Sequence, residues 1–314
     1  MKNLLVAPLL NAKEALILLF TAVLRKSNFS SLTYGILISL LGLLSLSTLL
    51  FSLNFFYFHY IGNNYFPENS IFIGLILILI SGGTCLLYSA RHVSFIILRE
   101  ILFFYLILAS LALLTNAVQY TPFPTIDKEI IWIESLFKIE MITLVNWTAQ
   151  HANLKKILLF AYASLEYQMA FLPLFIIFTL NWERIRTYYY LLIVTALIGF
   201  SIYYFFPTTA PASNFPSNFF SAEQLATGVK FTEIHQGLSP TTAAGGMIAF
   251  PSFHAIWAYL CLYLTYEYRR LFFLLLPLNV LLMAACVLLG WHYPLDLLGA
   301  GVVIILSHGI CKHL

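Results

Sequence analysis

Charged side chains are scarce in this sequence. Lysine, arginine, aspartate and glutamate make up 9% of the 314 residues, while hydrophobic residues make up 61%. In a soluble protein of this length, roughly a quarter of all residues are charged and help to cover the surface. The shortage therefore excludes a soluble globular protein and predicts an integral membrane protein. The formal net charge of +3 is too small to indicate a nucleic-acid partner.

The residue patterns that mark metal, nucleotide and disulfide sites are also missing. The four cysteines lie in or at the end of apolar runs without metal-ligand spacing, so they indicate buried thiols and no disulfide framework. No glycine-rich nucleotide loop and no metal-ligand cluster is evident, so we expect no metal and no cofactor. The first apolar run is interrupted by Asn11, Lys13 and Glu14, which disfavours a secretory signal.

Long apolar runs are what the sequence does contain. Eight of them approach the ~20 residues that a spanning helix needs, and they predict an all-α polytopic membrane helix bundle of about eight spans. A short patch at 15–24 predicts a helix lying in the membrane interface. We expect 1–95 to hold this helix plus two additional spans, and 96–314 to form a six-helix core. The predicted spans are 34–56, 71–90, 98–118, 156–180, 187–206, 251–268, 271–290 and 294–311.

The arginines and lysines are distributed unevenly between the loops. They cluster before the first predicted span and after the second, fourth, sixth and eighth, whereas 57–70 has none and 207–250 has only Lys230. The positive-inside bias then predicts that both termini are cytoplasmic and that 207–250 and 290–294 face the other side. The lysines of 119–155 oppose this orientation, but long loops are weak topology signals. We expect a protein of a bacterial inner membrane with its polar clusters on the periplasmic side.

Two segments on that side show patterns of their own. Residues 128–150 predict an amphipathic helix, with Glu134 and Lys138 four apart on one face. We expect this helix either to lie flat on the outer surface and form a wall of a lipid entrance, or simply to pack against the other helices. Residues 207–250 are rich in Pro, Ser, Thr, Asn and Gly, and a loop of this length is usually functional or disordered. Its position directly before Pro251 favours a function.

His292 and Asp296 stand four residues apart at the start of the last predicted span. On a helix this spacing places both side chains on one face. A carboxylate that accepts the Nδ1 proton leaves Nε2 with a free lone pair, as in a nucleophile or a base. The alternative is a pair that only anchors a helix end. Ionisable residues beside lipid are costly, which favours a function.

His254 begins the sixth predicted span, just after Pro251 and Ser252. Proline suits the first helical turn, and the free N–H groups of that turn, together with the Ser252 hydroxyl, suit an anion. A histidine two residues further on can protonate a departing oxygen. Alone, such a histidine is more often structural, but two histidines at outer helix ends, one with a carboxylate, indicate chemistry on phosphate.

These motifs resemble those of a known family. Pro-Ser-Phe-His at 251–254 and His-Tyr-Pro-Leu-Asp at 292–296 resemble the second and third motifs of the type 2 phosphatidic acid phosphatase superfamily. Residues 246–301 most resemble its inositol phosphorylceramide synthase-like branch, and a weaker likeness reaches back to about 120. The resemblance implies a phosphohistidine mechanism and a six-helix phosphatase-type core. By it, His292 attacks phosphorus, Asp296 orients it, His254 protonates the leaving oxygen, and Ser252 holds a phosphate oxygen.

The sequence departs from the phosphatase pattern in its cations. The first motif, a lysine followed by Arg-Pro, is missing near 200–215, and the Ser-Arg that opens the third motif is Ala285 and Cys286 here. A phosphomonoester carries nearly two charges and favours arginine clamps, whereas a diester carries one. We therefore favour a lipid headgroup phosphotransferase over a lipid phosphate or diphosphate phosphatase. A non-catalytic lipid transporter is the third hypothesis, disfavoured because the polar residues gather at one face.

Three more residues are candidates for contact with a phospholipid or lipid-phosphate substrate. Glu166 lies inside the fourth predicted span, where a carboxylate is a functional candidate; a helix–helix hydrogen bond is the alternative. Lys230 and His235, in the long loop, are candidates for the phosphate or an acceptor, with ordinary solvated loop residues as the alternative. The sequence does not predict an oligomeric state.

Overall fold

The computed structural model describes residues 31–59, 69–89, 91–242 and 248–312, and these contain helices and no strand. The predicted all-α class is therefore confirmed for this part of the chain. The predicted interfacial helix at 15–24 lies outside the described residues. The elements are α2 (Ser31–Leu53), η1 (Asn54–Phe58), α3 (Ser70–Leu87), α4 (Val93–Val118), α5 (Asp127–Leu136), α6 (Met141–Gln150), α7 (Ala152–Phe178), α8 (Trp182–Phe205), η2 (Pro211–Ser213), α9 (Ala222–His235), α10 (Phe253–Thr265), α11 (Arg269–Leu288) and α12 (Pro294–Cys311).

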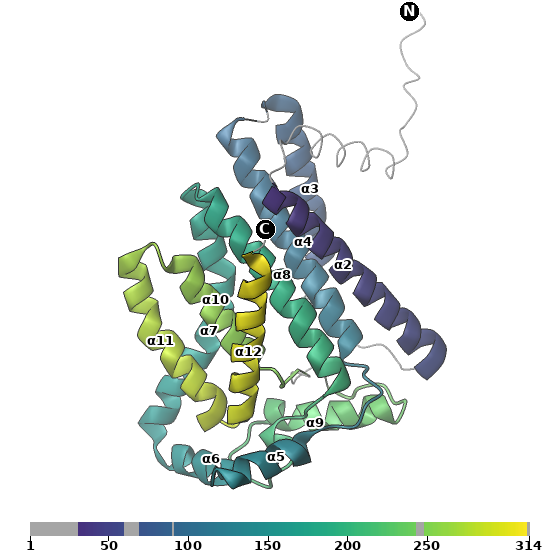
Figure 1. The fold of residues 1–314 in the computed structure, drawn as a ribbon, viewed down its shortest axis with the longest axis vertical. Helices are drawn as coiled ribbons and strands as arrows, with labels where there is room; N and C mark the ends of the chain where they lie inside the picture. Colours follow the sequence, from purple (N-terminus) through teal and green to yellow (C-terminus); the bar gives the residue numbers. More distant parts are fainter. Residues whose placement is uncertain (1–30, 60–68, 90, 243–247, 313–314) are drawn as a thin grey trace, which may run out of the picture.

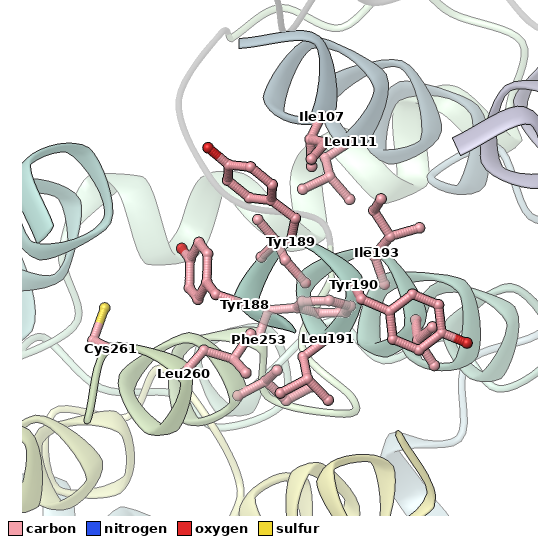
Figure 2. Close-up of a cluster of buried hydrophobic side chains, with 14 of the residues drawn as sticks. Ile107, Leu111, Tyr188, Tyr189, Tyr190, Leu191, Ile193, Phe253, Leu260 and Cys261 are labelled. Atoms are coloured by element: carbon pink, nitrogen blue, oxygen red, sulfur yellow. The ribbon is translucent and has the colours of Figure 1, made fainter. Parts of the chain in front are cut away.

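Helix α8 lies at the centre of the bundle. It contacts α2, α4, α7, α10 and α12, and in Figure 1 these helices surround it. Its residues 188–196 are buried on every side of the helix, as expected for a helix that is apolar all round. Figure 2 shows this core: Ile107 of α4 on one side of α8, and Phe253 and Leu260 of α10 on the other. The core thus fixes the position of α10, which begins with the Pro-Ser-Phe-His motif.

Six of the eight predicted spans meet a criterion of helix length and apolar composition. Among the described residues, six helices are long and apolar enough to cross a membrane, namely α2, α4, α7, α8, α11 and α12. The other two predicted spans correspond to the shorter apolar helices Ser70–Thr84 and Phe253–Thr265. Helix α10 is shorter than the predicted 251–268 at both ends: it ends at Thr265, and it begins at Phe253, where the Ser252 side chain accepts a hydrogen bond from the N–H of Ala255. The count of eight and the division at residue 95 remain predictions.

The amphipathic segment 128–150 is two helices rather than one. Helices α5 and α6 are separated at 137–140, where Lys138 has a positive φ of 58°. Lys138 therefore leaves the helix, and the predicted pairing on one face with Glu134 is wrong. Glu134 is buried and accepts a hydrogen bond from the N–H of Leu295 at the start of α12.

The long segment 207–250 is not a continuous loop. It contains α9, which begins with a capping box in which Ser221 and Gln224 each bond the other's backbone N–H. In Figure 1, α5, α6 and α9 lie together across one end of the bundle, where α12 begins. The segment is joined to α5 by Asp127, whose carboxylate accepts hydrogen bonds from the N–H and hydroxyl of Thr209. These three helices enclose the end of the bundle that holds both polar motifs.

Candidate active site

His292 lies in the turn between α11 and α12, and two acceptors face its Nδ1. The Ala249 carbonyl oxygen lies 3.0 Å from Nδ1 and the Asp296 Oδ2 lies 3.3 Å from it. The same Asp296 oxygen accepts a hydrogen bond of 2.9 Å from the N–H of Tyr293. Because both partners of Nδ1 accept, Nδ1 carries the proton and Nε2 presents its lone pair.

His254 contacts the Nε2 atom that carries this lone pair. Nε2 of His292 lies 3.3 Å from Nδ1 of His254, and the two rings cross at 61°. Since Nε2 of His292 is an acceptor, Nδ1 of His254 is the donor of this hydrogen bond. Residues 38 positions apart in the sequence are thereby brought into direct contact.

Burial governs the protonation of His292. It is almost fully buried, and this burial lowers its pKa from 6.5 to about 4, partly opposed by the hydrogen bond to the Ala249 carbonyl. The ring is thus neutral at pH 7. A neutral imidazole with a proton on Nδ1 has its Nε2 electron pair available for attack.

The two rings border a cavity of about 100 Å³. None of the described residues that line it is an arginine or a lysine. The lining combines the two histidines, aromatic rings, small residues and two polar side chains of α9: Tyr162, Ala210, Ala212, Gln224, Thr227, Ile248, Ala249, His254, Gly290, Trp291 and His292. The cavity is small, and its described lining residues include no carboxylate, arginine or lysine.

A comparison with known protein families identifies the superfamily of this chain. A family model of the PAP2 superfamily matches residues 128–310, more than half of the chain. The chain belongs to the PAP2 superfamily. The match covers α5 to α12 and so includes every residue of the cavity. No curated protein and no solved structure matches the chain.

Membership in the PAP2 superfamily fits the apolar helices and the site described above. It indicates a membrane enzyme of the phosphatase or phosphotransferase type, acting on a lipid or another phosphate ester. The expected superfamily is therefore confirmed. The match does not separate the inositol phosphorylceramide synthase-like branch from the others.

Ser252 has a different environment from the two histidines. It is fully buried, caps α10 through its hydroxyl, and its side chain also interacts with the thiol of Cys286. Its N–H donates to the Asp296 carbonyl oxygen, which ties the start of α10 to the start of α12. Ser252 is not among the residues that line the cavity. Cys286, at the position of the phosphatase arginine, thus packs behind the first turn of α10.

Lys230, His235 and Glu166 also lie off the cavity lining. Lys230 is buried on α9, three residues after Thr227, and burial lowers its pKa to about 8 against the opposing charge of Glu233. Both ring nitrogens of His235 contact backbone carbonyls, those of Phe231 and Thr121. Glu166 is exposed on α7, one turn beyond Tyr162.

The sequence patterns missed several residues that surround the two histidines. Tyr162 stacks between His254 and Trp291, with ring centroids 4.4 and 5.1 Å away. Gln224 closes the cavity and donates a hydrogen bond to the Leu289 carbonyl, which connects α9 to α11. The capping-box spacing of Ser221 and Gln224 is the one local signal that would have revealed α9. No local pattern reveals the aromatic stack, because Tyr162 is more than 90 positions from both of its partners.

Proposed function

We propose that this protein cleaves a phosphoester bond of a membrane lipid through a phosphohistidine intermediate on His292. The observation that carries the proposal is the contact of His292 Nε2 with His254 Nδ1 at a cavity, while Nδ1 of His292 faces Asp296 and Ala249. A buried, neutral imidazole with an oriented lone pair, beside a second imidazole that can donate a proton, is suited to attack on phosphorus.

The first step forms the bond from Nε2 of His292 to phosphorus and breaks the bond from phosphorus to the leaving oxygen. The anionic phosphate of the bound substrate favours the protonated form of His254, and this imidazolium donates the proton that the leaving oxygen needs. Positive charge develops on the His292 ring during attack, and the carboxylate of Asp296 stabilises it. Substrate must replace the hydrogen bond between the two rings, since their 3.3 Å separation leaves no room for phosphorus. In this step the Ser252 hydroxyl holds a non-bridging phosphate oxygen. To reach that oxygen, the hydroxyl must turn away from the N–H of Ala255, from which it accepts a hydrogen bond in the α10 cap.

The second step regenerates the enzyme. An alcohol or a water molecule attacks the phosphorus, His254 removes its proton, and the bond between phosphorus and Nε2 breaks. Transfer to an alcohol makes the protein a phospholipid headgroup phosphotransferase, whereas transfer to water makes it a lipid phosphate or diphosphate phosphatase. Glu166, His235 and Lys230 remain candidates for contacts with the rest of the substrate or acceptor.

The charge of the cavity favours the phosphotransferase. No arginine or lysine lies among its described lining residues, and Cys286 stands where the phosphatase pattern has arginine. A dianionic phosphomonoester in such a cavity lacks counter-charge, whereas a diester needs less. The likeness of residues 246–301 to the inositol phosphorylceramide synthase-like branch supports the same choice.

Product analysis with matched variants tests the proposal. Purified protein in lipid nanodiscs is incubated with a phosphatidic acid or with a phosphodiester lipid, each with and without a lipid alcohol acceptor. We expect turnover of the diester that depends on the acceptor, and its loss in His292→Ala and His254→Ala. Full activity in either variant refutes the mechanism. Release of inorganic phosphate from phosphatidic acid as the dominant reaction assigns the phosphatase instead.

A further inference from the structure

Two carboxylates of α5 hold the first turn of α12. Glu134 Oε1 accepts a hydrogen bond of 3.0 Å from the N–H of Leu295, and Asp127 accepts a hydrogen bond from the hydroxyl of Tyr293. Leu295 is the second residue of α12, where backbone N–H groups have no acceptor within their own helix. Tyr293, which precedes the helix, is not a residue type that caps helices well. Glu134 therefore acts as a cap supplied by another helix.

The same turn carries the catalytic carboxylate. The N–H of Tyr293 donates to Asp296 Oδ2, the oxygen that also faces His292. Tyr293 is thus held at its hydroxyl by Asp127 and Asn214, and at its backbone by Asp296. It is fully buried, in a cluster with Ile130 of α5 and Met141 of α6. A displacement of α5 therefore moves the oxygen that orients His292.

The arrangement is costly, and the cost indicates a constraint other than packing. Asp127, Glu134 and Asp296 are all nearly fully buried. Burial raises the pKa of Asp127, and burial together with the charge of Asp296 raises the pKa of Glu134. A stable fold alone gains little from buried carboxyl groups, and such departures from local rules are typical of functional sites.

We propose that Asp127 and Glu134 are positioning residues that set the orientation of Asp296 toward His292 through the first turn of α12. They touch no substrate. This inference rests on the proposed function for its consequence, since a correctly held Asp296 matters for the rate only when His292 is the nucleophile. Glu134 acts directly on the helix start, and Asp127 acts through the Tyr293 hydroxyl.

The test compares Glu134→Leu, Glu134→Gln and Tyr293→Phe, with Glu129→Leu as the matched control. Glu129 is an exposed glutamate of the same helix. Glutamine keeps an oxygen for the N–H of Leu295, whereas leucine removes it. Two readouts are needed: steady-state kinetics in nanodiscs, and hydrogen–deuterium exchange of the peptide covering 290–297.

We expect Glu134→Leu to lower kcat about 10- to 100-fold, as for a catalytic group misplaced by about 1 Å. KM should stay within about two-fold, because substrate binding is not removed. Amide exchange should rise in 290–297 and not elsewhere. Glu134→Gln and Glu129→Leu should match the unmodified protein, and Tyr293→Phe should lower kcat about five-fold, the equivalent of one hydrogen bond.

Each failure has a distinct meaning. Faster exchange in 290–297 with unchanged kcat overturns the positioning role, as does an equal loss of kcat in Glu129→Leu. Exchange that rises throughout the protein assigns a general structural role. If Glu134→Leu does not fold, unchanged kcat and exchange in Tyr293→Phe overturn the link through Asp127. Absence of turnover in the unmodified protein counts against the proposed function, while the exchange data still test whether α5 holds the turn.

Discussion

At the scale of single residues, the site depends on which nitrogen of His292 carries the proton. Two acceptors face Nδ1, the Asp296 carboxylate and the Ala249 carbonyl oxygen, and each of them favours the tautomer with the proton on Nδ1. A backbone acceptor is present whatever the ionisation of Asp296. The carboxylate is then needed chiefly for the charge that develops during attack and less for the choice of tautomer.

The pH profile follows from the burial of this ring. The neutral form of His292 is the active one, so activity is present above its pKa and lost below it. Because burial lowers that pKa from 6.5 to about 4, we expect kcat/KM to stay level through pH 6 and to fall only toward pH 4. The measurement uses a phosphodiester lipid, whose phosphate does not titrate in this range. A decline centred on pH 6.5 would show that the ring is exposed in the working enzyme.

At the scale of elements, the turn between α11 and α12 places His292. Gly290 has a positive φ of 80°, a conformation that residues with a Cβ rarely adopt. A Cβ at this position would also lie 2.5 Å from a ring carbon of Phe220 and 2.9 Å from Val145. The turn therefore fits only because its first residue has no side chain, and it packs directly against α6 and the segment before α9.

Gly290→Ala should destabilise the protein and displace His292. The backbone conformation costs about 1–2 kcal/mol, and crowding against Phe220 and Val145 adds ~1–3 kcal/mol. Thermal unfolding in detergent and kcat measure the two effects. Gly301→Ala is the matched control, since Gly301 is inside α12 with nothing within 4 Å of its added Cβ. Equal melting temperatures for the two variants would contradict the role given to Gly290.

At the scale of the whole molecule, the two ends of the bundle differ in chemistry. The end with α5, α6 and α9 holds His254 and His292 and the buried carboxyl groups of Asp127, Glu134 and Asp296. At the start of α8 and near the start of α4, Arg186 and Arg99 both contact the buried carboxylate of Glu100, at 2.9 and 2.8 Å. Arg269 and Arg270 begin α11, at the far end of α10 from His254. The positive-inside bias predicts that this arginine-rich end faces the cytoplasm.

Cysteine labelling checks this orientation. In a background without the native cysteines, Gln236→Cys at the end of α9 should react with an impermeant thiol reagent added to intact cells, and Arg270→Cys should react only after permeabilisation. Both positions are exposed, so a cysteine that fails to react is shielded by the membrane from the reagent and is not buried in the protein. Labelling of Arg270→Cys alone would place the site on the cytoplasmic side.

Much of the site was predictable because the signals are local. The Pro-Ser-Phe-His motif predicts the start of α10. His292 Nδ1 and Asp296 Oδ2 lie 3.3 Å apart as expected from their spacing, but His292 lies in the turn before α12 and not on its face. The break of 128–150 into α5 and α6 was not predictable in the same way. The break lies at Lys138, which takes a positive φ of 58° although it is not a glycine, and no periodicity reveals such a residue.

The sequence alone thus determined the membrane setting, the superfamily and the identity of the two motifs, because composition, apolar runs and short spacings are properties of neighbouring residues. Only the tertiary structure decided that His254 and His292 touch, that Cys286 lies behind Ser252, and that α5 holds the turn of Asp296. These facts depend on how α8 and its neighbours pack, since side-chain contacts between distant segments are set by the shape of the whole core.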